Sequence, residues 1–317
     1  KPKSKNLEIG LINLKKISKY LYPIEIVMNV FYILLKKKIF FKKNTISCTI
    51  GVYNISPIIS SAILNKKSFW FIVEDVSRFS FFLLKVIKFL FSPEIILIDK
   101  FLKKKININN CKILPPYLRK KKVIKKIKNF SLMPELLSVG NINTAKGYDF
   151  LLQEIFNNKI KCKLNILGKK LSTQIALNKK INFYKKKLKI EGICEVNFLG
   201  FKNENYIKKI ILNSDLFILP SYTEGCPNAL LEAMSLGSIV LASNVGAIPN
   251  IIKHQKNGYL FDHNKGDFFK VYNQILNTSS LDLKKVSKMA KKTISEKFAN
   301  KKKFIKNYEN IFLSCSL

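Results

Sequence analysis

Short apolar runs, separated by lysine clusters and turn residues, predict alternating strands and helices in the first third of the chain. The run at 94–99, Glu-Ile-Ile-Leu-Ile-Asp, is typical of a buried strand, and Pro115 ends the apolar run at 111–114. Strands that alternate with helices indicate βαβ units and a parallel sheet. The pattern predicts strands at 45–52, 68–73, 94–99 and 111–114, with helices at 19–35 and 79–91.

The same alternation is clearer after residues 119–134, a lysine-rich stretch that we interpret as a linker because it has little apolar content before Phe130 and ends at Pro134. We predict a doubly wound α/β unit beyond it. Its strands are expected at 135–139, 163–167, 195–199, 216–219, 239–242 and 258–261. Its helices are expected at 149–157, 171–189, a segment ending near 213, 227–236, 249–253, 267–276 and 282–313.

The chain carries 57 Lys and Arg against 20 Asp and Glu, a net charge of +37, yet only Arg78 and Arg119 are arginines. Proteins that read nucleic acids rely on the planar fork of arginine, so we predict no nucleic-acid partner. Lysine, isoleucine and asparagine are abundant together, as an AT-biased coding sequence would produce. A surface selected to bind a polyanion or a membrane is the alternative interpretation.

Cysteine and histidine patterns exclude several classes. The six cysteines form no C-x-x-C pair and there are two histidines, so we expect reduced thiols and no metal site. G-x-G-x-x-G is absent, which disfavours a dehydrogenase. We expect a cytoplasmic chain, because it has neither a signal-peptide pattern nor a run of about 18 uncharged apolar residues.

Residues 210–252 contain no lysine or arginine, although about eight would be expected at the chain average of 57 in 317. The three ionisable residues in this segment are Asp215, Glu224 and Glu232, all of them acids. Burial of a strand–helix–strand layer explains part of the lysine deficit. It does not explain why both glutamates are present.

The strand at 216–219 leads into a turn and then a helix in which Pro227 suits the first turn, because a first-turn amide has no acceptor. The amides that follow lie at the positive end of the helix dipole and can bind a phosphate. Glu224 in the turn and Glu232 on the helix flank this end, and carboxylates accept hydrogen bonds from sugar hydroxyls. The alternatives are a solvated turn residue for Glu224 and an ordinary helical residue for Glu232.

The segment from Glu224 to Gly237 resembles the motif of the retaining family 4 glycosyltransferases (glycosyl transferases group 1). Its sequence is Glu-Gly-Cys-Pro-Asn-Ala-Leu-Leu-Glu-Ala-Met-Ser-Leu-Gly. Ser-Val-Gly-Asn-Ile-Asn-Thr-Ala-Lys-Gly, ending at Gly147, is similar to the V-G-R-x-x-x-x-K-G element of that family. Asn141 and Asn250 depart from the family pattern, which usually has Arg and Glu there. The resemblance covers roughly residues 135–300.

The resemblance implies a GT-B-like α/β fold, with two Rossmann-like doubly wound domains facing a cleft. The expected organisation is an acceptor-side domain at 1–118, which looks short or truncated, the linker at 119–134, a nucleotide-sugar-binding domain at 135–297, and a C-terminal helix at 298–317 that packs back on the first domain. Lys146 would bind the donor diphosphate, Glu224 the transferred sugar and Glu232 the ribose. Glu224 and Lys146 are the implied catalytic residues. The implied donor-binding residues are Gly140, Asn141, Lys146, Phe201, Glu224, Gly225, Cys226, Pro227, Asn228, Ala229 and Glu232.

The implied reaction moves a sugar with retention from a nucleotide-diphosphate donor, a UDP-sugar, to a saccharide or lipid-linked saccharide in surface polysaccharide or lipopolysaccharide synthesis. No cofactor or metal is expected, because the family usually needs no metal and the sequence has no D-x-D motif to hold one. Lys146 and the helix end would stabilise the leaving diphosphate. A nucleotide-sugar epimerase of the same fold and a catalytically weakened nucleotide-sugar-binding protein are the alternatives. Aromatic and basic residues at 77–91 suit an anionic membrane surface at the inner membrane face, and a core helix is the competing interpretation.

Overall fold

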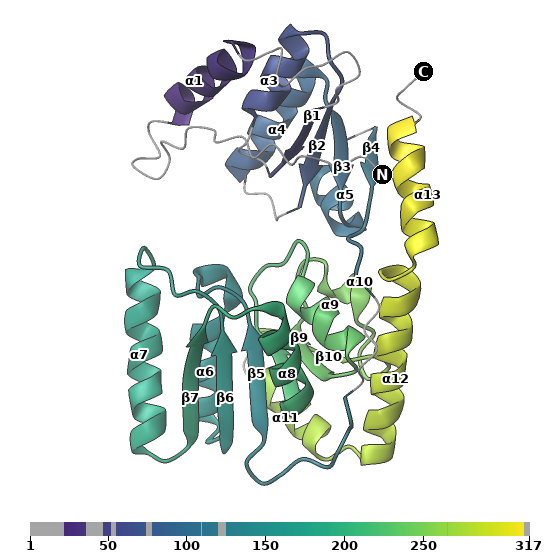
Figure 1. Ribbon diagram of the computed structural model, residues 1–317. Helices are drawn as coiled ribbons and strands as arrows, with labels where there is room; N and C mark the ends of the chain where they lie inside the picture. The colour runs from purple at the N-terminus through teal and green to yellow at the C-terminus, as the bar shows by residue number, and fades with distance from the viewer. Residues whose placement is uncertain are drawn as a thin grey trace. The chain divides into compact units, whose positions relative to one another are not determined.

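The computed structural model describes residues 22–35, 47–51, 55–73, 78–108, 110–119, 125–264 and 266–313. They form two compact units (Figure 1). The first contains the described residues up to Ile98 together with Leu102–Ile113. The second contains Asp99–Phe101 and the described residues from Leu114 onward.

The first unit is built on a parallel sheet in the order β1-β2-β3-β4. Its strands are β1 (Ser47–Ile50), β2 (Ser68–Ile72), β3 (Glu94–Leu97) and β4 (Cys111–Ile113), which confirms the four strand predictions. Helices α1 (Tyr22–Leu35) and α4 (Arg78–Phe91) confirm the two predicted helices. The prediction missed α3 (Ser56–Ile63) and α5 (Lys100–Ile106), which are short.

The inner strand β2 carries the largest buried side chains of the first unit. Phe69 and Trp70 of β2 are fully buried, and the Trp70 indole nitrogen donates to the carbonyl of Gly51 at 2.8 Å. Helix α4 buries Leu84 and Ile87. Because consecutive strand residues point to opposite faces of a sheet, both faces of β2 are buried.

The second unit is a six-stranded parallel sheet in the order β10-β9-β8-β5-β6-β7. The strands are β5 (Glu135–Val139), β6 (Cys162–Leu167), β7 (Cys194–Gly200), β8 (Leu216–Leu219), β9 (Ile239–Ser243) and β10 (Tyr259–Phe261). The helices are α6 (Tyr148–Asn157), α7 (Ile175–Ile190), α8 (Glu204–Asn213), α9 (Asn228–Ser235), α10 (Ile248–Ile251), α11 (Asp267–Leu276), α12 (Ser280–Lys297) and α13 (Lys301–Leu313), with a 3₁₀ turn, η3 (Thr144–Lys146). The predicted doubly wound unit is confirmed.

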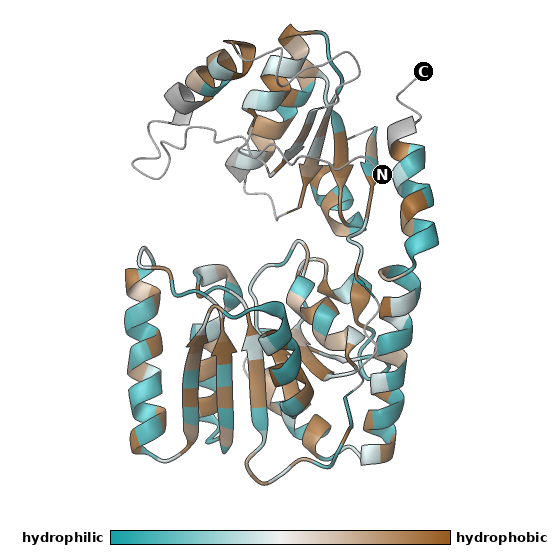
Figure 2. Ribbon diagram, viewed as in Figure 1, coloured by the Kyte–Doolittle hydropathy of each residue, from teal (hydrophilic) through white to brown (hydrophobic). Residues whose placement is uncertain are grey.

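Alternate residues of its central strands enter two separate cores. In β8, Leu216 and Ile218 join α6, α7 and α11, whereas Phe217 and Leu219 join α8, α9 and α12. Both faces of these strands are therefore apolar, as in buried parallel sheets. In Figure 2, α7 and α12 are largely hydrophilic with hydrophobic residues interspersed, which is typical of helices that cover a sheet.

One prediction about the C-terminal end of this unit needs correction. The helix predicted at 282–313 is interrupted, because α12 ends at Lys297 and the Asn300 side chain accepts from the amide of Lys303 at 3.0 Å, capping α13. The linker predicted at 119–134 stays a prediction; within it, Ile127 and Phe130 pack against the core of the second unit. The prediction that residues 298–317 pack on the first domain stays a prediction.

Candidate active site

The strand order of the second sheet reverses between β5 and β8. The chain winds outward from β5 through β6 to β7, then crosses back to β8 on the other side of β5. Ligands of open parallel sheets bind at the carboxyl ends of strands beside such a switch point. The loops that follow β5 and β8 carry Lys146 and Glu224, so the two predicted catalytic residues flank this point.

The loop after β5 places Lys146 at the end of the 3₁₀ turn, directly before Gly147. Gly147 has φ +63°, and a Cβ on it would lie 2.0 Å from the carbonyl oxygen of Pro220. The position therefore needs glycine both for its left-handed backbone and for its contact with the β8 loop. The amide of Tyr222 donates to the Ala145 carbonyl at 2.8 Å, which ties the two loops together again.

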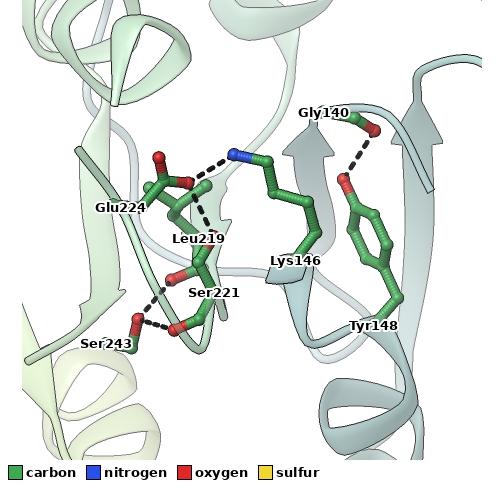
Figure 3. Close-up of polar contacts among 7 residues, drawn as sticks. All are labelled: Gly140, Lys146, Tyr148, Leu219, Ser221, Glu224 and Ser243. Carbon is green, nitrogen blue, oxygen red and sulfur yellow. Dashed lines mark hydrogen bonds and ion pairs between the residues drawn. The ribbon is translucent and has the colours of Figure 1, made fainter. Parts of the chain in front are cut away.

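Glu224 and Lys146 form an ion pair across 78 residues of sequence (Figure 3). The Lys146 Nζ lies 2.5 Å from Oε1 of Glu224, and the Ser221 hydroxyl donates to the same oxygen at 2.8 Å. The Glu224 side chain is 6% exposed and that of Lys146 is 24% exposed. The structure thus brings the two predicted catalytic residues together and adds Ser221, which the sequence reasoning did not single out.

The start of α9 differs in detail from the prediction. Pro227 is the N-cap residue of α9 rather than a first-turn residue, with φ −80° and ψ 67°, the angles of an inverse γ-turn. In this turn the Asn228 amide donates to the Cys226 carbonyl at 2.9 Å, so it is not the free donor that was expected. The first bond of the helix runs from Leu231 to Pro227 at 3.0 Å, which leaves the amides of Ala229 and Leu230 without intrahelical acceptors.

The remaining predicted residues of this segment surround that helix start. Glu232 is half-buried on α9, one turn after the exposed Asn228. Gly225 is buried, whereas Cys226 is half-buried with its sulfur 3.2 Å from Oδ1 of Asn228. Burial, followed by the charge of Glu224, raises the pKa of the Cys226 thiol to about 12, so it is protonated at neutral pH.

Three glycine-containing loops meet at the carboxyl ends of β5, β6 and β7. A Cβ on Gly168 would lie 2.0 Å from the Gly140 carbonyl, and the Gly168 amide donates to the Gly200 carbonyl at 3.0 Å. Asn141 accepts from the amide of Lys169 through Oδ1 at 3.0 Å, so its side chain helps to hold these loops. Phe201 follows Gly200 and is 81% exposed, a platform open to solvent.

Tyr148 holds the loop after β5 through a hydrogen bond, and the sequence reasoning did not single it out either. Its ring is fully buried at the start of α6, and its hydroxyl donates to the carbonyl of Gly140 at 2.9 Å (Figure 3). Burial raises the pKa of the Tyr148 hydroxyl, which keeps it a donor. A Cβ on Gly140 would lie 3.2 Å from that hydroxyl and 3.3 Å from Cε of Lys146, so Gly140 gives the lysine stem room.

A cavity of about 600 Å³ lies elsewhere, at the amino ends of the strands of the second unit, where Lys125, Glu135 and Asp215 line it. Within the described ranges, no three His, Cys, Asp or Glu side chains gather as metal ligands would. None of the helices in the described part of the chain has the length and apolar character needed to cross a bilayer.

Several known proteins that are similar in sequence to this chain are glycosyltransferases. An uncharacterized glycosyltransferase of Haemophilus influenzae is 31% identical over 133 residues, 41% of this chain and 35% of that protein. A UDP-Gal:alpha-D-GlcNAc-diphosphoundecaprenol alpha-1,3-galactosyltransferase of Escherichia coli is 39% identical over 71 residues, 22% of this chain and 18% of that protein. The matched segments thus span about a fifth to a third of these relatives.

The solved structure of Anabaena HepE in complex with UDP and glucose has a TM-score of 0.74 to this chain, with 15% identity over 96% of this chain and 83% of that one. The chain therefore has the GT-B fold of glycosyltransferases, as predicted. The glycosyl transferases group 1 family matches residues 119–295, more than half of the chain. The chain belongs to this family.

Proposed function

We propose that the chain is a retaining glycosyltransferase of family 4 type that transfers a sugar from a UDP-sugar to a saccharide or lipid-linked saccharide acceptor. The single observation that carries this proposal is the Lys146–Glu224 pair at the switch point, beside the start of α9. Surface polysaccharide or lipopolysaccharide synthesis is the proposed setting. The Escherichia coli relative supports it, because its name specifies a UDP-galactose donor and a diphosphoundecaprenol-linked acceptor.

In the proposed mechanism, different residues of this site bind different parts of the nucleotide-sugar donor. The Lys146 ammonium and the free amides of Ala229 and Leu230 supply positive charge where a leaving diphosphate gains negative charge. Glu224 accepts hydroxyl hydrogen bonds from the transferred sugar, and Glu232 does so from the ribose. Phe201 offers a face for the base. The proposal includes no metal or cofactor, since the protein's own groups provide this charge.

Isothermal titration with UDP, GDP and their glucose, galactose and N-acetylglucosamine derivatives tests the proposal. We expect UDP-sugar binding by the wild-type protein and at least a tenfold loss in Lys146→Ala and Glu232→Gln, about 1.4 kcal/mol or more. Lys159→Ala is the matched control, because Lys159 also lies 2.5 Å from a glutamate, Glu191, but is exposed. Wild-type affinity in both site variants would refute the assignment.

Incubation of the donor without an acceptor separates transfer from epimerisation. A transferase leaves the sugar unconverted or slowly hydrolyses it, whereas an epimerase changes its configuration, which proton NMR detects. A weakened binding protein would bind UDP-sugar and neither transfer nor convert it. The Asn141 side chain, whose Oδ1 binds the Lys169 amide, has no cation to offer a diphosphate, so Asn141→Arg is expected to raise affinity for UDP.

We also propose a peripheral location at the cytoplasmic face of an anionic membrane. Helix α4 buries Leu84 and Ile87 but exposes Phe82, Phe89 and Leu90, which are 65%, 85% and 59% exposed. Lys85 is exposed on the same helix, so apolar and cationic groups face solvent together. Flotation with phosphatidylglycerol vesicles should fall in high salt and in Phe89→Ser. Equal flotation with neutral vesicles would contradict this proposal.

A further inference from the structure

Ser221 is the second residue after β8, in the loop that carries Glu224 of the candidate active site. Its side chain is fully buried, and its hydroxyl donates to Oε1 of Glu224 at 2.8 Å. A serine hydroxyl is joined to the main chain through one side-chain torsion with three staggered positions, so a fixed main chain narrows the places it can occupy, and its bond to Glu224 selects one of them. In Figure 3 the other carboxylate oxygen of Glu224 points away from both donors, the Ser221 hydroxyl and the Lys146 ammonium.

The main chain of Ser221 is itself held by the neighbouring strand. The hydroxyl of Ser243, the fully buried last residue of β9, donates to the Ser221 carbonyl at 2.6 Å (Figure 3). The Glu224 main chain is held separately, since its carbonyl accepts from the Ala247 amide at 3.0 Å. Gly246 approaches so closely that a Cβ there would lie 2.0 Å from the Glu224 carbonyl oxygen.

Lys146 holds the same oxygen of Glu224 in a different way. Its ammonium sits at the end of a flexible four-carbon stem and is partly exposed, and an ammonium is attracted to a phosphate as a point charge. A diphosphate bound at the start of α9 would therefore compete with Glu224 for Lys146. The Ser221 hydroxyl is buried and bears no charge, so it stays on the carboxylate when the lysine turns away.

We propose that Ser221 is a positioning residue that fixes the Glu224 carboxylate toward the transferred sugar while Lys146 engages the diphosphate. The inference rests on the proposed function, since it takes the donor to be a UDP-sugar. It assigns Ser221 to recognition of the sugar, not of the nucleotide. Ser243 acts one step further back, by holding the Ser221 main chain.

Titration of Ser221→Ala with UDP and with UDP-sugar tests this assignment. We expect UDP to bind within twofold of wild type, because UDP lacks the sugar. We expect the UDP-sugar preferred by the wild type to bind about tenfold more weakly, with a lower kcat, as for loss of one hydrogen bond to a charged group. Ser221→Thr, which keeps a hydroxyl, should recover part of the loss.

Two further variants make the result decisive. Ser287→Ala is the control, because Ser287 is also buried in the second unit and donates to a carbonyl, that of Gly237, at 2.7 Å, yet lies outside the site. Ser243→Ala should weaken UDP-sugar binding by a smaller factor and again leave UDP binding nearly unchanged. It replaces Ser221→Ala as the test variant if Ser221→Ala fails to fold. Equal losses for UDP and UDP-sugar, or none, would overturn the inference. Absence of UDP binding by the wild type would instead overturn the proposed function.

Discussion

Burial should make the Lys146–Glu224 pair much stronger than an exposed pair of the same geometry. Lys146→Met leaves a carboxylate that is 6% exposed with Ser221 as its remaining donor. Removing one member of a buried pair costs roughly 3–5 kcal/mol, and of an exposed pair roughly 0–1 kcal/mol. With the lysine 24% exposed and Ser221 still bound, we expect a loss of about 2 kcal/mol in the free energy of unfolding.

The reverse change should cost less. In Glu224→Gln the amide oxygen still accepts from Ser221, and the released ammonium can turn to solvent, so we expect about 1 kcal/mol. The double variant should lose about 2 kcal/mol rather than 3, a coupling energy of about 1 kcal/mol. Lys159 and Glu191 form the comparison pair: their atoms also lie 2.5 Å apart, but the side chains are 63% and 37% exposed, and we expect a coupling below about 0.5 kcal/mol.

Hydrogen exchange, read on peptides from β5 and β8, measures the stability of the second unit under native conditions. The single tryptophan, Trp70, is buried in the first unit, so its fluorescence reports whether that unit is unaffected. Equal coupling energies in the two lysine–glutamate pairs would refute the argument, because burial would then make no difference. A double variant that loses the full sum of the single losses would refute the pairing itself.

Two other changes test the backbone and the buried charge of the second unit. Gly147→Ala should lower its stability by more than about 1 kcal/mol, because φ is +63° and the new Cβ would meet the Pro220 carbonyl; an unchanged melting temperature would contradict this. Lys125 is 8% exposed, and burial lowers its pKa from 10.5 to about 8. Between these values the unfolded state binds more protons, so stability rises with pH, and Lys125→Met should add up to about 3 kcal/mol at pH 7 and much less near pH 10.5 in urea titrations. A gain that does not vary with pH would refute that explanation.

Much of the second unit could be predicted from the sequence because its strands are short, largely apolar runs, and β5 to β8 each end at or directly before a glycine or proline. β8, for example, is four fully buried residues followed by Pro220. Helices α3 and α5 were missed because they are 8 and 7 residues long, too short for a clear period. The break between α12 and α13 depends on one capping side chain, Asn300, which a helical pattern does not reveal.

The candidate site was only partly predictable, for a different reason. The motif around Glu224 could be recognised locally, but its contact with Lys146 joins residues 78 positions apart and depends on the strand order. The role of Ser221 was hidden because a serine after a strand is common in turns. The Asn228 amide was wrongly expected to be a free donor, because it bonds to the Cys226 carbonyl in the inverse γ-turn at Pro227. A proline at a helix start is compatible with this turn and with a first helical turn, so the sequence does not distinguish them.

The lysine-free segment at 210–252 is explained by the burial of its strands, and the cations that contact it come from other parts of the chain. β8 and β9 are buried on both faces, so a lysine within them would lose its hydration without a partner. The cations come instead from the loop after β5 and from Lys125, in the stretch of chain before β5. Lys146 reaches Glu224 at the carboxyl ends of the strands, and Lys125 reaches the Asp215 carbonyl at their amino ends. A cation on a separate loop can leave Glu224 for a diphosphate without disturbing β8, and the bond from Ser221 then holds the carboxylate in place.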